Sequence, residues 1–91
     1  MATIHIKKAH AVDHETVKQE VQNLADKLSK DLSADYQWEG DRLVFKRKGA
    51  SGHIDISETE VDIEIKLGMV LTPLKGTIEK TVTSYLDEHL G

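Results

Sequence analysis

The sequence predicts one α+β domain over residues 1–91, built from a curved antiparallel β-sheet with both helices packed on one of its faces. Two long segments repeat apolar residues at helical spacing, one in each half of the chain. Between them, short segments alternate apolar with polar residues and are separated by turn residues, as in consecutive antiparallel strands. The expected order of elements is β-α-β-β-β-β-α, with about five strands in the sheet.

The N-terminal third of the chain predicts a short strand and a long helix. Ile4 and Ile6 alternate with polar residues over 3–7, which is the period of a half-buried strand. Asp13 is a favourable N-cap, so a helix is expected from His14 to Leu32. The apolar stripe of this helix comprises Val17, Val21, Leu24, Ala25, Leu28 and Leu32.

Residues 35–46 predict a β-hairpin whose register follows from its turn. Gly40 and Asp41 suit a two-residue loop of type II′, because glycine adopts the positive φ that the first position requires. With this loop the large apolar side chains face each other, and opposite charges pair beside them. A slip by one residue would turn every side chain to the other face. The expected pairs are Asp35–Lys46, Tyr36–Phe45, Gln37–Val44, Trp38–Leu43 and Glu39–Arg42.

The next turn is predicted to be a four-residue loop formed by residues 49–52, GASG. This loop would set Phe45 opposite Ile56 and keep apolar and polar side chains on separate faces. A last strand alternates over 61–67, after a turn whose length stays open between even-numbered values. We expect the first strand to pair with this last strand, because the long helix separates the first strand from the second.

The C-terminal segment predicts a second helix, with Thr72 as its N-cap and Pro73 at its first position. Two apolar helical stripes and one apolar sheet face must cover one another, so both helices are expected on the same side of the sheet. The stripe of the second helix comprises Leu74, Ile78, Val82, Tyr85, Leu86 and Leu90.

The composition limits the function classes that the chain can serve. The absence of Cys excludes disulfides and thiolate metal sites. The formal net charge is −4, whereas dedicated nucleic-acid-binding domains are usually basic. No segment approaches the roughly 20 apolar residues of a transmembrane helix. We therefore expect a cytoplasmic protein that binds no nucleic acid and has no transmembrane segment.

No catalytic, metal or cofactor site is expected. His10 and His14 flank Asp13, but the helix begins there, so the two imidazoles do not share a helical face. The Gly-x-x-Gly sequence at 49–52 matches the nucleic-acid clamp of KH domains, where it joins two helices; a tight turn between strands is the favoured interpretation here. No nucleophile with an adjacent base and no paired carboxylates emerge, so the chain is not expected to be an enzyme.

Seven residues are candidates for a ligand or interaction groove between the hairpin and the second helix. The aromatic residues among them could line such a groove or could mainly fill the core. A chain of this length has few side chains to line a cavity of roughly 300 Å³ and also supply a core, so we expect at most a small surface opening. The candidates are Tyr36, Trp38, Phe45 and Arg47 of the hairpin and Leu74, Ile78 and Tyr85 of the second helix.

Several strings along the chain resemble the polyhydroxyalkanoic acid system protein family. They are "IHIKKAH" near the N-terminus, "YQWEGDRLVFKRKGASGHIDI" in the hairpin region and "LGMVLTPLKGTIEKTVTSYLDEHL" at the C-terminus. The resemblance implies a small bacterial protein, encoded in some members near polyhydroxyalkanoate synthesis or granule genes, and it implies no catalytic residues. The order of elements is also similar to a reduced helix-grip architecture, whose larger members often hold apolar ligands; fold alone does not fix function.

The resemblance and the residues together favour a non-enzymatic accessory protein of polyhydroxyalkanoate storage without a cofactor. Its candidate partners are a storage granule surface, an apolar acyl ligand and a partner protein. The location expected from this reading is the cytoplasm, at storage granules. The alternative is a structural or protein-interaction domain that pairs through a sheet edge, for example as a homodimer, and binds no ligand.

Overall fold

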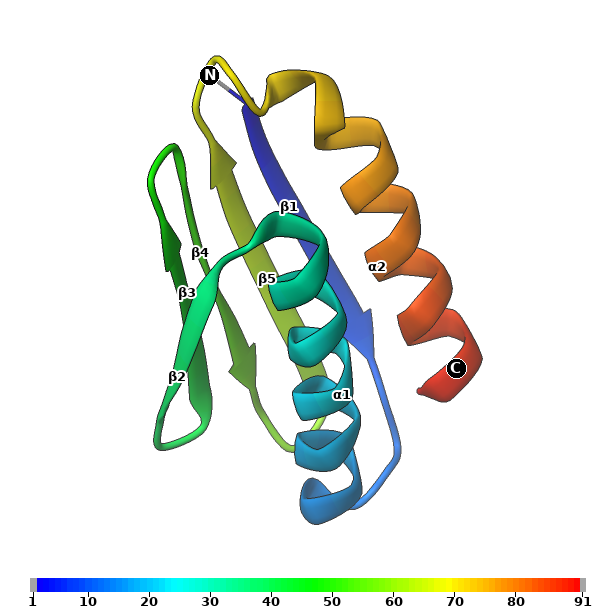
Figure 1. Ribbon diagram of the computed structural model, residues 1–91. Coiled ribbons are helices and arrows are strands. Elements are labelled where there is room, and N and C mark those ends of the chain that lie inside the picture. The colour runs from blue at the N-terminus through cyan, green and yellow to red at the C-terminus, as the bar shows by residue number, and fades with distance from the viewer. Residues whose placement is uncertain (1, 91) are drawn as a thin grey trace.

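The computed structural model describes residues 2–90 and contains one five-stranded antiparallel sheet with both helices on one of its faces (Figure 1). The predicted fold class and the order of elements are confirmed. The elements are β1 (Ala2–Ala9), α1 (His14–Leu32), β2 (Asp35–Glu39), β3 (Arg42–Arg47), β4 (Ala50–Ile56), β5 (Glu60–Leu67), the 3₁₀ turn η1 (Thr72–Leu74) and α2 (Lys75–His89).

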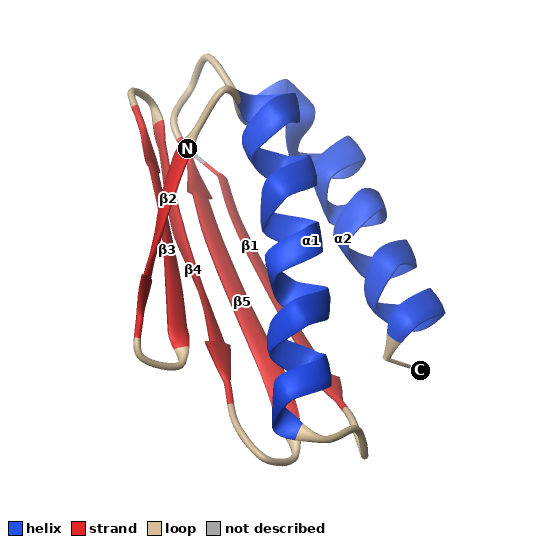
Figure 2. Cartoon of the chain, turned by 60° about the horizontal axis from the view of Figure 1, so that its bottom comes forward, coloured by secondary structure: helices blue, strands red, loops and turns tan. Residues whose placement is uncertain are grey.

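The strands lie in the order β1-β5-β4-β3-β2, so β1 and β2 form the two edges of the sheet. β1 pairs antiparallel with β5, as predicted. α1 connects the two edges and packs against β2 and β4, whereas α2 packs against β1. Figure 2 shows the resulting two layers, with the sheet on one side and both helices on the other. The opposite face of the sheet stays uncovered and carries mostly polar side chains.

Helix α1 forms where the sequence predicts it because its first turn is capped. The Asp13 carboxylate accepts hydrogen bonds from the Thr16 backbone N–H at 3.1 Å and from Thr16 Oγ1 at 2.8 Å. These hydrogen bonds hold the pKa of Asp13 below its ordinary value. The helix ends at Leu32, and the next residue, Ser33, is its C-cap, with a φ of 54° in the left-handed conformation. All six residues of the predicted stripe are buried.

The predicted register of the β2–β3 hairpin is confirmed at every pair from Asp35–Lys46 to Glu39–Arg42. φ is positive at Gly40 (65°) and not at Asp41, which is the sign pattern of a type II′ turn. The guanidinium of Arg42 binds the carboxylate of Asp55 on β4, with Nε 2.6 Å from Oδ1. The charge of Glu39 lies close enough to contribute to the raised pKa of Arg42, after the hydrogen bond to Asp55 and the Asp55 charge.

The predicted loop at residues 49–52 is wrong. β3 and β4 are joined by a turn of two residues, Lys48 and Gly49, and Phe45 lies opposite Gly52 rather than Ile56. Gly49 adopts a φ of 85°, which allows the tight turn. The true register differs from the predicted one by four residues, and an even shift leaves every side chain on its expected face. The alternation of the sequence therefore could not distinguish the two registers.

The β4–β5 connection keeps the predicted faces, since Ile56 lies opposite Val61 across an even number of residues. At Gly52 the backbone of β5 approaches closely: a Cβ atom there would lie 2.6 Å from the carbonyl oxygen of Glu64. This approach explains glycine inside β4, at the position opposite Phe45 on β3.

The predicted start of the second helix is also wrong. Thr72 does not cap α2; its hydroxyl donates to the carbonyl oxygen of Gly68 at 3.0 Å. Pro73 lies in η1, and α2 begins at Lys75. Leu71, just before η1, is buried and anchors this segment in the core. The chain therefore turns once more before the helix, and Leu74 stays 40% exposed instead of joining the buried stripe.

The core lies between the sheet and the two helices. Ile78, Val82, Leu86 and Leu90 of the C-terminal stripe are buried, and Tyr85 is half-buried beside them. Among residues 2–90 no polar or charged residue is buried, and no buried side-chain nitrogen or oxygen lacks a hydrogen-bond partner. The core of the described chain is thus entirely apolar.

Candidate functional site

The polar ends of Tyr36 and Trp38 converge on one face of α1. Trp38 Nε1 donates to Gln22 Oε1 at 2.5 Å, and Tyr36 Oη donates to the carboxylate of Asp26. Gln22 Nε2 in turn donates to Tyr36 Oη and, at 3.2 Å, to Asp26 Oδ1. We call these four side chains the aromatic corner. Because β2 is an edge strand, the aromatic corner ties that edge of the sheet to α1.

Both rings of the aromatic corner are half-buried against the core. The ammonium group of Lys18 lies 4.9 Å from the centre of the Trp38 ring, a cation–π contact. The hydrogen bond to Asp26, and secondly burial, raise the pKa of Tyr36 above its ordinary value of 10.0. The phenol therefore remains a neutral hydrogen-bond donor at physiological pH, with its donor committed to Asp26.

Phe45 lies beside Tyr36, with 6.2 Å between ring centres, and is buried. Next to it an apolar hollow is lined by side chains of α1, β3, β4 and β5, and its free volume is about 10 Å³. That volume holds about one water molecule, whereas ligand cavities start at roughly 300 Å³. The hollow therefore has no room for a ligand, and Phe45 is part of the core.

Arg47 has a structural partner in the fold. Its Nη1 donates to the carbonyl oxygen of Leu32, and its Nε donates to the carbonyl oxygen of Lys48 at 3.1 Å. Carbonyl groups in the last turn of a helix lack intrahelical partners, and a cation there also interacts favourably with the helix dipole. Arg47 thus provides a hydrogen-bond donor for the C-terminal end of α1.

The structure does not join the seven candidate residues into one groove. Leu74 and Ile78 lie on α2, which packs against β1 at the opposite edge of the sheet from Tyr36 and Trp38. α1 separates the two groups, as Figure 2 shows. Ile78 is buried, whereas Leu74 is partly exposed at the start of α2.

Tyr85 links α2 to α1. Its hydroxyl donates to Glu20 Oε2 at 3.3 Å, and Nδ1 of His89 lies 3.0 Å from the same oxygen. The rings of Tyr85 and His89 stack with 4.1 Å between their centres. Burial, and secondly the negative charge of Glu20, raise the pKa of Tyr85.

The most exposed large apolar side chains of the described chain, Met69 and Val70, are not among the residues that the sequence pattern indicated. Met69 is 81% exposed and Val70 is 88% exposed in the loop between β5 and α2, next to the partly exposed Leu74. We call these three residues the apolar tip. A signal was available: Met69 and Val70 follow Gly68 and belong to neither the alternation of β5 nor the stripe of α2.

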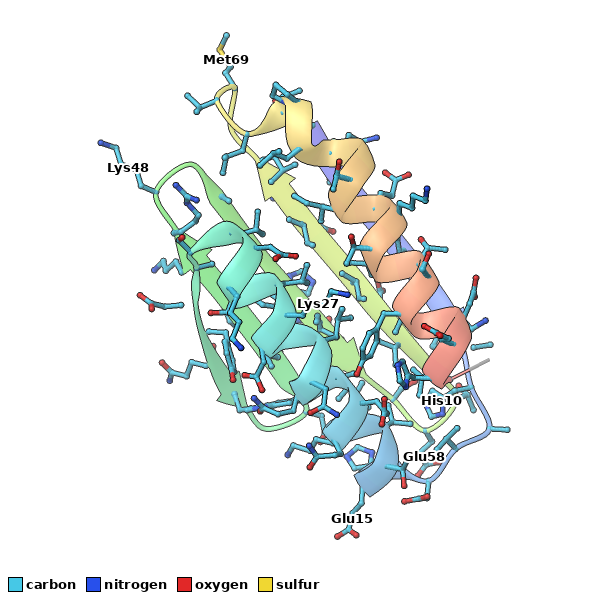
Figure 3. The ribbon with its side chains drawn as sticks, turned by 45° about the vertical axis from the view of Figure 1, so that its right-hand side comes forward. His10, Glu15, Lys27, Lys48, Glu58 and Met69 are labelled. Atoms are coloured by element: carbon cyan, nitrogen blue, oxygen red, sulfur yellow. The ribbon has the colours of Figure 1, made fainter. Side chains whose placement is uncertain are left out.

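Three exposed lysines lie at the same end of the molecule as the apolar tip. Lys46 and Lys66 both lie opposite Ser51, on its two sides, on the uncovered face of the sheet, and Lys48 is in the β3–β4 turn. We call Lys46, Lys48 and Lys66 the basic rim. The β3–β4 turn contacts the tip loop, since the Gly68 N–H donates to the Gly49 carbonyl oxygen at 2.7 Å. Figure 3 shows Lys48 and Met69 at this common end.

The histidines singled out by their spacing have separate partners. Nε2 of His10 lies 3.0 Å from the Ser57 carbonyl oxygen, and Nε2 of His14 lies 2.8 Å from Asp41 Oδ1. Within residues 2–90, no three side chains of the metal-ligating types are grouped to hold an ion. In the same part of the chain, neither helix combines the length and the apolar character needed to cross a membrane.

Residues 4–90 match the family described as "Putative polyhydroxyalkanoic acid system protein". Comparisons with curated proteins and with solved structures give no match. The matched residues include all of α1, β2, β3, β4, β5 and α2 and most of β1. The chain therefore belongs to the polyhydroxyalkanoic acid system protein family.

Proposed function

We propose that this protein is a non-enzymatic accessory protein of polyhydroxyalkanoate storage that acts in the cytoplasm by docking onto the surface of storage granules. Family membership supports the link to storage. The filled core supports docking at the surface over enclosure of a ligand, and it is the observation on which the proposal depends. The apolar hollow beside Phe45 is too small for an acyl chain, at about 10 Å³.

The roles of the perturbed titratable groups support a non-enzymatic function. Active sites typically contain groups in a cleft whose pKa values are strongly shifted by burial together with a specific charge partner. Here the pKa values of Asp13, Tyr36, Arg42 and Tyr85 are shifted. Asp13 caps a helix, and each of the other three side chains joins two elements of the fold. These contacts account for the shifts without a substrate.

Co-sedimentation with lipid-free polyhydroxyalkanoate particles tests this function. We expect the folded protein to sediment with the particles and native mass spectrometry to show the chain without a bound acyl species. A tight one-to-one complex that buries an acyl probe would instead identify a carrier. Absence of sedimentation with particles would contradict docking onto the polyester itself.

The alternative function, pairing through a sheet edge, has one observation in its favour. β1 is an eight-residue strand that pairs only with β5 within the described chain, so one side of its backbone is available to another strand. Light scattering after size-exclusion chromatography distinguishes the two functions. A stable dimer that Lys7→Pro disrupts without unfolding the monomer would favour the interaction domain.

A further inference from the structure

We propose that the apolar tip and the basic rim together form a docking surface for an anionic lipid layer. The inference rests on the proposed function, docking onto a granule surface, and names the part of the molecule and the surface chemistry involved. The apolar side chains of the tip enter the layer, and the lysines of the rim contact its anionic head groups.

The apolar tip is exposed although the loop that carries it is well anchored. The N–H groups of Leu71 and Thr72 both donate to the Gly68 carbonyl oxygen at 3.1 Å, and the Thr72 hydroxyl donates to the same oxygen. The buried side chain of Leu71 fixes the loop to the core and approaches Gly49. Met69 and Val70 therefore project from a fixed turn, which lowers the conformational entropy lost when they enter an apolar phase.

The basic rim concentrates positive charge at this end of the molecule, although the formal net charge of the chain is −4. A surface hollow of about 350 Å³ beside the tip is lined by Lys46, Arg47 and Lys66 and by no carboxylate. Within residues 2–90, Lys46 and Lys48 form no ion pair, and Lys66 has only a distant one, 3.9 Å from Glu64. Asp35 lies opposite Lys46 in the sheet, but their side chains form no ion pair.

Acidic residues gather at the other end of the molecule. Glu15 and Glu58 lie there, far from Lys48 and Met69, as Figure 3 shows. Glu39 precedes the β2–β3 turn and Asp41 lies in it, at the opposite end of β3 from Lys48. A formal net charge of −4 thus coexists with a basic end, and the resulting charge separation orients the apolar tip toward an anionic surface.

The small size and the protrusion of the apolar tip favour a lipid layer over a protein partner. A stable protein–protein interface takes roughly 800 Å² from each partner, far more than three side chains on one turn supply. Peripheral proteins bind lipid surfaces with few inserted apolar residues when cations add attraction to anionic head groups. The combination of Met69, Val70 and Leu74 with three lysines has this character.

Vesicle co-sedimentation of the whole chain tests the inference. The vesicles contain phosphatidylglycerol and phosphatidylcholine in equal parts, or phosphatidylcholine alone. Two variants change the docking surface: Met69→Ser with Val70→Ser, and Lys48→Gln with Lys66→Gln. The matched control, Lys7→Gln with Lys80→Gln, removes the same charge from exposed positions on β1 and α2, away from the tip. Thermal melts show that each variant is folded.

We expect the parent chain and the control to bind the phosphatidylglycerol vesicles and to bind phosphatidylcholine vesicles far less. Each docking-surface variant is expected to bind about tenfold more weakly, and binding is expected to fall with added salt. Equal binding by all variants would overturn the inference. Binding to polyester particles without binding to vesicles would overturn it and leave the proposed function standing. Binding to neither would contradict both.

Discussion

The aromatic corner and the apolar tip both bring large apolar side chains to the surface, but they differ in what those side chains contact. In the corner, Tyr36 and Trp38 pack against the core, and their polar atoms bind Gln22 and Asp26. In the tip, Met69 and Val70 are more than four-fifths exposed. The corner completes the fold, whereas the tip leaves apolar area in water.

This difference shows that the type of a residue indicates its function less well than the contacts that its side chain makes in the fold. Aromatic residues beside a basic run suggest recognition, yet in this fold Tyr36 and Trp38 tie an edge strand to a helix. An exposed apolar pair beside lysines that form at most one distant ion pair within residues 2–90 marks a surface able to bind a partner, because burying apolar area is favourable. The predictions below separate residues that stabilise the fold from residues that are free to bind.

The largest effect is expected in the core that lies beneath both regions. Val82→Asp places a carboxylate at a position with no solvent exposure, which should cost about 5 kcal/mol or more and abolish folding of a domain this small. Circular dichroism checks this. The control, Lys80→Asp on the exposed face of α2, should melt close to the parent chain. Similar melting of both variants would contradict the assignment of the buried face.

Truncation of a side chain should lower stability clearly in the aromatic corner and hardly at all in the apolar tip. Trp38→Ala should lower the free energy of unfolding by about 2 kcal/mol, less than for a fully buried tryptophan, because the ring is half-buried. Val70→Ala should change it by no more than about 0.5 kcal/mol. Urea denaturation measures both. A large loss for Val70→Ala would mean that the tip is part of the folded core.

A smaller effect should follow from removing the shared amide of the aromatic corner. Gln22→Ala leaves Trp38 Nε1 without its acceptor and removes a donor to Tyr36, which should cost about 1 kcal/mol. Gln19→Ala is the control, since Gln19 is exposed on the same helix and bonds only Asn23 in the described chain. A double-mutant cycle with Trp38→Phe should show coupling between Gln22 and Trp38.

The smallest effect concerns alkaline pH. The folded-state pKa values of Tyr36 and Tyr85 lie above the ordinary value of 10.0, so the unfolded chain loses these protons first. Their contribution to stability is therefore fully present below about pH 10 and is lost as pH rises through the folded values. Tyr36→Phe should flatten this decline. An unchanged pH profile of urea midpoints would argue against the hydrogen bond to Asp26.

The two hairpins show how much of the fold the sequence could predict. For β2–β3, the turn residues and the pairing of charges agreed on one register, and that register is correct. For β3–β4, the predicted and observed registers differ by an even number of residues and sort the faces identically. The contact of Gly49 with Gly68 and the close approach of Gly52 to β5 favour the observed one. Both contacts involve residues distant in sequence.

The sequence by itself determined the fold class, the order of elements, α1 with its Asp13 cap and the buried face of each strand, because local periodicity and capping encode these features. Only the tertiary structure decided which surface residues have partners. Arg47 binds the end of α1 and Tyr85 binds Glu20, whereas Met69 and Val70 stay largely exposed. The physical reason is that periodicity records which way a side chain faces, whereas its contacts depend on how distant elements are packed.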